Sequence, residues 1–295
     1  MSAAPQVIDP TVAKAPVTLP MLADKFATGE PIVMVTAYDF PSAQVAEAAG
    51  VDMVLVGDSA AMVVLGYPST VPVSTDELIM LGSAVRRGLR TPFVVADLPF
   101  GSYEASDAQA VATAQRFIKE AGADAVKLEG GGVMVERARA IVAAGIPVMG
   151  HVGLTPQTST ALGGYKAQGR TSGAALKVAQ DALALQDAGC FSIVFEAIPA
   201  AVASELVDRL SIPVIGIGAG ADTAGQVLVF HDLLGIYDGH APRFAKRYAH
   251  LKAEMVEAVQ AYGDEVRTGA FPAPEHTYSI DPGELAELRA ALAAA

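Results

Sequence analysis

Cysteine, tryptophan and basic residues are scarce in this sequence. It has no tryptophan and a single cysteine, Cys190, among 295 residues. One cysteine cannot close an internal disulfide, so nothing in the sequence points to an oxidising compartment, and we interpret Cys190 as a small buried hydrophobic residue. A chain of this length buries about three-quarters of its surface on folding, so its stability does not depend on disulfides.

Positive charge is also in short supply, with 20 Lys and Arg residues against 32 Asp and Glu residues and a net charge of −12. Nucleic acids and anionic membranes are recognised by clustered basic side chains, so the sequence predicts neither as a partner. It also lacks the run of about 18 apolar residues that crosses a bilayer, because the apolar stretch from Ala140 to Gly150 is interrupted by Pro147. The expected partners are small-molecule substrates.

The N-terminal stretch, Met1 to Pro20, has no compact apolar segment of the kind found in secretory signals. It carries Asp9 and three prolines. We therefore expect a loose leader, no cleaved signal, and a soluble protein in the cytoplasm.

Short apolar segments alternate with longer alanine-rich segments from Pro31 onward. The short segments are apolar on both faces, which is typical of parallel strands covered by helices. We expect eight strands, at Ile32–Thr36, Met53–Gly57, Phe93–Asp97, Ala125–Glu129, Val148–Val152, Ile193–Glu196, Val214–Ile217 and Val227–Phe230. The pattern predicts an α/β fold, a closed (β/α)8 TIM barrel, and a doubly wound parallel sheet is the competing architecture.

The segments between the strands are long enough for crossover helices, at Thr75–Leu89, Asp107–Ala121, Val135–Ala144, Gly173–Ala188 and Ala201–Leu210. Asp107 is the expected N-cap of one helix, and glycines mark several helix ends, at Gly50, Gly88, Gly122, Gly145 and Gly189. No linker divides the chain. We expect a leader and short helix over residues 1–27, one barrel domain over 28–276, and a helical tail over 277–295.

Polar residues stand at the ends of the expected strands, where the active site of a (β/α)8 barrel lies. They include Tyr38, Asp39, Asp58, Ser59, Asp97, Lys127, Glu129, His151, Glu196, His231 and Asp232. A lone acidic residue at a strand end is usually a helix cap or a solvated side chain. Four carboxylates from four strands would instead repel one another and raise each other's pKa, and a hard divalent cation such as Mg²⁺ resolves that conflict.

Lys127 and Glu129 are two residues apart on one strand, so both side chains point into the barrel. The lysine has three interpretations: an internal salt bridge to Glu129, a cation that binds a substrate carboxylate, or a Schiff-base lysine. His151 and His231 are either nitrogen ligands of a metal or hydrogen-bonded histidines that line the mouth of the barrel, and we favour the second interpretation for both.

Two glycine-rich segments follow later strands. The "GIGAG" turn, Gly216 to Gly220, either presents backbone N–H groups to an anion or reflects close packing of the last two strands. The "GGYKAQGR" segment, Gly163 to Arg170, is either a lid whose cations, Lys166 and Arg170, attract an anionic cosubstrate, or a solvated surface loop.

Eight motifs in order resemble those of the ketopantoate hydroxymethyltransferase family. They are "TAYD" (36–39), "LVGDS" (55–59), "ADLPFGSY" (96–103), "VKLEGG" (126–131), "GHVGLTPQ" (150–157), "GGYKAQGR" (163–170), "IPVIGIGAG" (212–220) and "FPAPEH" (271–276). The resemblance covers most of the chain. It departs at Leu162, where we associate the family with an aromatic residue, and in the alanine-rich tail from Glu284 to Ala295.

The resemblance implies a barrel like that of phosphoenolpyruvate mutase and isocitrate lyase, assembled as a homodecamer. It implies transfer of a hydroxymethyl group from the cosubstrate 5,10-methylenetetrahydrofolate to 3-methyl-2-oxobutanoate. The product is 2-dehydropantoate, or ketopantoate, of the pantothenate and coenzyme A pathway, formed through a Mg²⁺-stabilised enolate. Because the folate is an anion, Lys166 and Arg170 become the candidate cations that recruit it.

By the same resemblance, the Mg²⁺ ligands are Asp58, Asp97 and Glu129, the substrate contacts are Asp58, Ser59, Asp97 and Lys127, and the catalytic proton acceptor is Glu196. Two other classes remain open. One is a metal-dependent C–C or P–C lyase on the same barrel, which needs no one-carbon donor. The other is a non-catalytic barrel, and the presence of all these residues argues against it.

Overall fold

The computed structural model describes residues 15–237, 239 and 242–294, and separates the chain into two compact units, Met1–Tyr248 and Ala249–Ala295. The expected leader lies mostly outside the described residues, and its helical part is α1, Leu19–Thr28. In the described part of the chain, no helix is long and apolar enough to cross a membrane.

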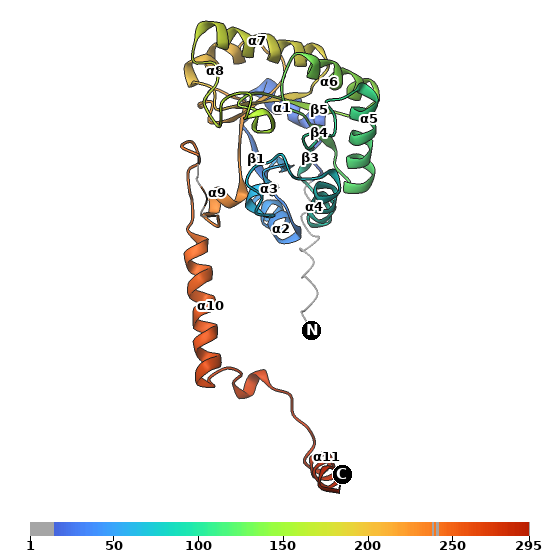
Figure 1. Ribbon diagram of the computed structural model, residues 1–295, viewed down its shortest axis with the longest axis vertical. Helices are drawn as coiled ribbons and strands as arrows, with labels where there is room; N and C mark the ends of the chain where they lie inside the picture. Colours follow the sequence, from blue (N-terminus) through green and yellow to red (C-terminus); the bar gives the residue numbers. More distant parts are fainter. Residues whose placement is uncertain (1–14, 238, 240–241, 295) are drawn as a thin grey trace. The chain divides into compact units, whose positions relative to one another are not determined.

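The first unit is a closed barrel of eight parallel strands in sequence order, with β8 paired to β1 (Figure 1). This confirms the predicted (β/α)8 barrel and rules out a doubly wound sheet. The strands are β1 Ile32–Thr36, β2 Met53–Val56, β3 Phe93–Asp97, β4 Ala125–Lys127, β5 Val148–Gly153, β6 Ser192–Glu196, β7 Val214–Ile217 and β8 Gly225–Leu228.

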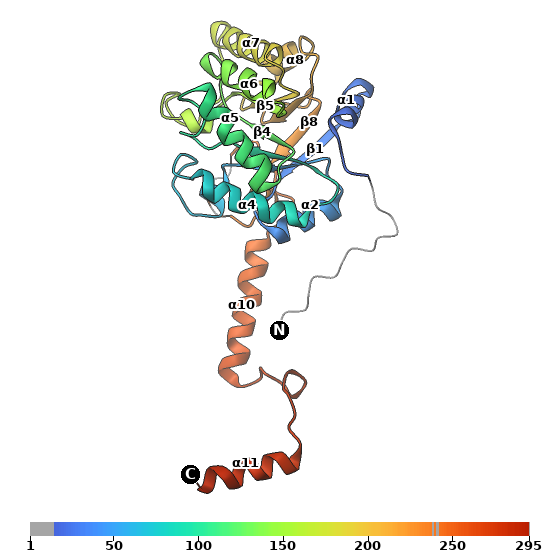
Figure 2. The ribbon, with the colours of Figure 1, turned by 90° about the vertical axis from the view of Figure 1, so that its right-hand side faces the viewer.

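Helices form the outer layer, and those that follow one another in the chain pack side by side around the strands (Figure 2). They are α2 Phe40–Ala49, α3 Ala60–Val63, α4 Thr75–Gly88, α5 Asp107–Arg116, α6 Val133–Ala143, α7 Ser172–Asp187, α8 Ala200–Val207 and α9 Phe230–Leu234, with a π-helical turn η2 at Phe117–Ala121 and a 3₁₀ turn η3 at Pro156–Thr158. Their buried faces and the outward faces of the strands share one apolar core.

A second apolar core fills the inside of the barrel. Leu22 of α1 packs in this cluster with strand residues such as Ile32 and Phe93, which lie at the N-terminal ends of their strands. The helix α1 therefore closes the bottom of the barrel, and the opposite end, where the polar strand ends lie, stays available for a site.

The last strand departs from its expected position. The sequence predicted Val227–Phe230, whereas β8 spans Gly225–Leu228, and His231 and Asp232 lie in α9 beyond it. A Cβ atom at position 225 would come within 2.3 Å of the carbonyl oxygen of Ile32, so only glycine lets the chain approach β1 there. The strand begins at that close approach, two residues earlier than its β-branched residues suggested.

Two helix-end predictions also need correction. The N-cap of α5 is Ser106, whose hydroxyl accepts a hydrogen bond from the backbone of Gln109, and Asp107 is the first helical residue. Gly88 is the last residue of α4 and does not terminate the helix in a left-handed conformation. The other four glycines do have positive φ, as the helix-end interpretation requires.

The second unit contains α10 Leu251–Thr268, a 3₁₀ turn at Pro274–His276 and α11 Pro282–Ala294. Only α11 falls within the expected tail, residues 277–295, and α10 lies in the range that was expected to belong to the barrel domain. No described residue of these helices is buried. The division at Tyr248 lies earlier in the chain than the expected domain boundary at residue 276.

Candidate active site

A cavity of about 610 Å³ opens at the C-terminal ends of the strands. The six residues that the sequence predicted as a site all line it: Asp58, Ser59, Asp97, Lys127, Glu129 and Glu196. They come from the ends of different strands and from the loops that directly follow them. Parallel strands of a barrel end at one rim, and this explains how residues so distant in sequence meet.

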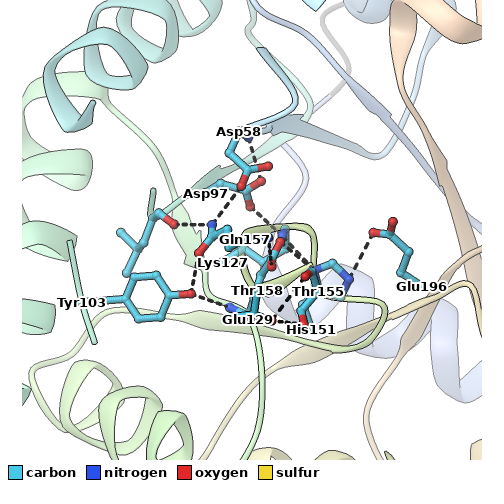
Figure 3. Close-up of polar contacts among 11 residues, drawn as sticks. Asp58, Asp97, Tyr103, Lys127, Glu129, His151, Thr155, Gln157, Thr158 and Glu196 are labelled. Atoms are coloured by element: carbon cyan, nitrogen blue, oxygen red, sulfur yellow. Dashed lines mark hydrogen bonds and ion pairs between the residues drawn. The ribbon is translucent and has the colours of Figure 1, made fainter. Parts of the chain in front are cut away.

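Asp58 and Asp97 lie next to each other and are almost completely buried. The backbone N–H of Asp58 donates to Oδ2 of Asp97 over 2.9 Å (Figure 3). Burial and the charges of Asp97 and Glu129 raise the pKa of Asp58 well above its ordinary value. The crowding expected from the sequence is therefore present, and the site favours an additional cation beside Asp58.

Lys127 is the cation already built into this cluster. Its Nζ lies 2.8 Å from Oδ1 of Asp97, so its ion-pair partner is Asp97 and not Glu129, the partner that one of the sequence interpretations named. Burial lowers the pKa of Lys127, but the charges of Asp97, Glu129 and Asp58 raise it above its ordinary value. A Schiff base requires a neutral amine, so the geometry favours an electrostatic role for this lysine.

His151 joins two glutamates across the site. Its Nδ1 lies 3.5 Å from Oε1 of Glu129, and its Nε2 lies 3.2 Å from Oε2 of Glu196. Burial and the charge of Lys127 lower the pKa of His151, whereas Glu129 and Glu196 raise it more, to about 9. Burial raises the pKa of Glu129, but the hydrogen bond and charge of His151 lower it below its ordinary value.

The carboxylate oxygens suit a hard divalent cation. Two buried oxygens lie beside cationic side chains: Oδ1 of Asp97 is 2.8 Å from Nζ of Lys127, and Oε1 of Glu129 is 3.5 Å from Nδ1 of His151. Among the described residues, no group of three or more His, Cys, Asp or Glu side chains is arranged as a metal site. The fit to Mg²⁺ rests on the carboxylate oxygens themselves, because this ion takes one or two protein carboxylates and completes its shell with water and substrate oxygens.

Ser59 lines the cavity, and its hydroxyl oxygen lies 2.7 Å from that of Tyr38, a buried residue outside the cavity lining. The ring of Tyr38 packs against that of His231, with centroids 5.4 Å apart. Burial lowers the pKa of His231, which does not line the cavity, so the structure gives no support for a metal ligand there.

The structure separates the interpretations of the two glycine-rich segments, residues 163–170 and 216–220. In "GGYKAQGR", Tyr165 and Lys166 line the cavity, but Arg170 does not. A second cation in the lining, Arg243, comes from the region after β8. The "GIGAG" turn fits the packing interpretation. A Cβ atom on Gly216 would lie 2.7 Å from the hydroxyl of Thr223 and 3.1 Å from the amide of Gln226, its partner in β8, so this glycine allows β7 and β8 to pack closely. Gly218 allows a further close contact, because a Cβ atom there would lie 2.4 Å from the ring of Phe244, beyond β8.

Comparison with known families decides the assignment. A family model described as ketopantoate hydroxymethyltransferase matches residues 16–274. The chain belongs to the ketopantoate hydroxymethyltransferase family. It is therefore an enzyme, a transferase.

Curated relatives in this family resemble the chain over nearly its whole length. A 3-methyl-2-oxobutanoate hydroxymethyltransferase of Moorella thermoacetica is 56% identical over 262 residues, which cover 89% of this chain and 97% of the relative. A protein of the same name from Thermus thermophilus is 53% identical over 252 residues, covering 85% and 96%. These names support ketopantoate formation and confirm the resemblance seen in the eight motifs.

The fold of this ketopantoate hydroxymethyltransferase also resembles solved structures with low sequence identity. Phosphonopyruvate hydrolase in complex with oxalate and Mg²⁺ matches with a TM-score of 0.58 at 14% identity, covering 88% of this chain and 92% of that chain. A 2,3-dimethylmalate lyase of the PEP mutase/isocitrate lyase superfamily matches with a TM-score of 0.56 at 18% identity, covering 91% and 93%. The predicted likeness of the fold to the barrels of phosphoenolpyruvate mutase and isocitrate lyase is confirmed.

Sequence reasoning assigned no role to two residues of this family site. Gln157 and Tyr103 are buried next to the carboxylates and bonded to each other. Both stand in motifs that carried the resemblance, "GHVGLTPQ" and "ADLPFGSY". A polar residue at the end of each motif was the available signal, but its partners become visible only in three dimensions.

Proposed function

We propose that this ketopantoate hydroxymethyltransferase uses 5,10-methylenetetrahydrofolate to hydroxymethylate 3-methyl-2-oxobutanoate, and so forms 2-dehydropantoate for pantothenate and coenzyme A synthesis. The observation that carries the proposal is the arrangement of one buried ammonium, three buried carboxylates and a fourth carboxylate, Glu196, around a single cavity. It provides a cation for an oxoacid, donors for a metal ion and a base.

In this proposal, Asp58 and Asp97 hold Mg²⁺, with Glu129 completing the metal site directly or through water. Bound Mg²⁺ supplies a Lewis acid that stabilises the negative charge developing on the keto oxygen of the substrate enolate. Lys127, fixed by its ion pair with Asp97, offers its remaining N–H groups to the substrate carboxylate. Ser59, held by Tyr38, is the other substrate contact.

Glu196 removes the proton from C3 of the oxoacid. The electron pair of the C–H bond moves into the C2–C3 bond, and the keto oxygen takes up negative charge. Glu196 is less buried than the other three carboxylates, with 14% of its side chain exposed, and so has access to the substrate from the open side of the cavity. The contact with His151 aims its carboxylate inward.

The nucleophilic carbon then attacks the one-carbon unit of the folate. A C–C bond forms as one of the two C–N bonds of the methylene bridge breaks, and water then displaces the second folate nitrogen and supplies the hydroxyl group of the product. The proton held by Glu196 and one proton of the water go to the two nitrogens, which leaves tetrahydrofolate. A five-carbon oxoacid fills only part of about 610 Å³, and the lining also includes Met62, Tyr165 and Phe244. We place the aromatic folate there, near the exposed cations Lys166 and Arg243.

Two further assignments belong to the same proposal: a homodecameric assembly and a location in the cytoplasm. The assembly is tested by the mass of the native particle in solution. It is consistent with the exposed helices α10 and α11, whose described residues are all solvent-accessible in the single chain.

The deciding experiment supplies the oxoacid and Mg²⁺ with and without methylenetetrahydrofolate. The proposal predicts ketopantoate and free tetrahydrofolate only in the complete mixture, in equal amounts. A C–C or P–C lyase would instead cleave its own substrate with no folate present. Absence of ketopantoate from the complete mixture would overturn the proposal.

A further inference from the structure

Gln157 reaches the centre of the site from an unusual place. It lies in the 3₁₀ turn Pro156–Thr158 directly after β5, yet only 4% of its surface is exposed. The turn is fixed by Pro156 at its start and by a 2.6 Å hydrogen bond between the hydroxyls of Thr155 and Thr158. The backbone therefore presents this amide to the strand ends in one defined position.

Every polar group of the Gln157 side chain is used. Its Nε2 donates to Oδ2 of Asp58 and to the carbonyl oxygen of Leu98, both over 2.9 Å. Its Oε1 accepts from the hydroxyl of Tyr103 over 2.7 Å. In addition, its backbone N–H donates to Oε2 of Glu129 over 3.0 Å (Figure 3).

The network also fixes which way the amide faces. The Tyr103 hydroxyl accepts a hydrogen bond from the backbone N–H of Glu129, so its own hydrogen is free to point to Gln157. The atom facing Tyr103 must then be an acceptor, and the NH₂ group is left to face the two acceptors, Asp58 and Leu98. A flipped amide would place two donors or two acceptors against each other at these contacts.

Gln157 thus holds two of the carboxylates that the proposed function gives to the metal. It touches Asp58 after β2 with its side chain and Glu129 after β4 with its backbone. The hydrogen bond occupies Oδ2 of Asp58 and fixes the orientation of its carboxylate. It acts on the cation through Asp58 and not by direct contact.

We propose that Gln157 is a positioning residue that presets the carboxylate of Asp58 for a divalent cation, with Tyr103 locking the amide in place. This inference rests on the proposed function, because it takes the metal site from there. Residues that orient metal ligands by hydrogen bonds change metal affinity by about 10- to 100-fold when they are removed.

The test is the substitution Gln157→Met, which keeps the length of the side chain and removes the amide. Mn²⁺ binding to the full chain, followed by electron paramagnetic resonance with no substrate present, should weaken by about 10- to 100-fold. Gln115→Met, at an exposed position of α5, is the matched control and should leave the affinity unchanged. Excess metal should restore much of the turnover of Gln157→Met, which a purely structural defect would not allow.

A second variant keeps the inference testable if Gln157→Met does not fold. Tyr103→Phe retains the ring and removes the hydroxyl that orients the amide, so metal affinity should fall by a smaller factor. Unchanged Mn²⁺ affinity in either folded variant, with only a lower melting temperature, would overturn the inference. Failure of the wild-type chain to bind Mn²⁺ at all would instead overturn the metal site of the proposed function.

Discussion

Nε2 of His151 lies 3.2 Å from Oε2 of Glu196. Nδ1 of the same ring lies 3.2 Å from Nζ of Lys127, which in turn lies 2.8 Å from Oδ1 of Asp97. A continuous line of polar contacts therefore connects the proposed base with the residues proposed to bind the oxoacid and the metal. The proposed base therefore belongs to the same network as the residues proposed to bind the oxoacid and the metal.

Loss of the Asp58 carboxylate should weaken metal binding. Asp58→Asn keeps the shape of the side chain and removes the charge, so we predict a fall in Mg²⁺ affinity of more than about tenfold. A Mg²⁺ titration of activity and direct Mn²⁺ binding both measure it. Asp76→Asn, which removes an exposed carboxylate on α4, serves as the control, and an Asp58→Asn titration that matches wild type would count against ligation there.

The buried Lys127–Asp97 pair makes a stability prediction. Lys127→Met leaves the carboxylate of Asp97 buried without its counter-ion, so the free energy of unfolding should fall by about 3–5 kcal/mol. Urea unfolding in excess EDTA measures the effect without a divalent cation to replace the ammonium. The double variant Lys127→Met with Asp97→Asn should recover part of the loss, and no recovery would contradict the pairing.

Glu47 gives a pH prediction away from the site. Its carboxylate accepts hydrogen bonds from the backbone N–H groups of Arg90 and Thr91, over 2.8 and 3.0 Å, and from the Thr91 hydroxyl over 2.7 Å. Burial raises the pKa of Glu47, but these bonds lower it below its ordinary value. Since the folded pKa is the lower one, this stabilisation is present above the unfolded pKa of about 4.3 and disappears as the pH falls through the folded pKa.

Glu47→Gln should therefore lower the free energy of unfolding near neutral pH by about 1 kcal/mol, because the group is partly exposed. The difference from wild type should shrink as the pH falls below about 4. Urea unfolding between neutral and acid pH measures it. Glu205→Gln, on the exposed side of α8, is the control, and a difference that grows in acid would contradict the assignment.

The cations at the mouth make a prediction about the cosubstrate. Lys166→Glu and Arg243→Glu should each raise the KM for methylenetetrahydrofolate by about threefold to tenfold, more at low salt, while leaving the KM for the oxoacid nearly unchanged. Arg170→Glu carries the same charge change outside the cavity lining and should have little effect. An equal effect of all three substitutions would indicate general repulsion and no local site.

The barrel was predictable because its signal is local and repeated. Eight short apolar segments separated by helical segments specify parallel strands, and the strand ends then specify which residues meet. The error at β8 arose where a single contact, between Gly225 and the backbone of Ile32, overrode the preference of the β-branched residues that follow.

The interior of the site was less predictable. The hydrogen bond from Gln157 to Asp58 joins residues 99 positions apart, and no spacing rule connects a turn after β5 with a loop after β2. The cations at the cavity were also only partly predictable. The sequence named Lys166 and Arg170, both from one segment, as the candidates that recruit the folate. Of these two, only Lys166 lines the cavity, and Arg243 comes from a segment that the sequence did not connect with it.

Proton exchange at C3 tests the central claim most directly. We predict that wild-type enzyme with Mg²⁺ in D₂O, without folate, incorporates deuterium at C3 of 3-methyl-2-oxobutanoate. Glu196→Gln should fold and bind the metal, but exchange about 10²- to 10⁴-fold more slowly. Exchange at the wild-type rate in Glu196→Gln would assign the base to another residue, and no exchange by wild type would contradict the account of the site.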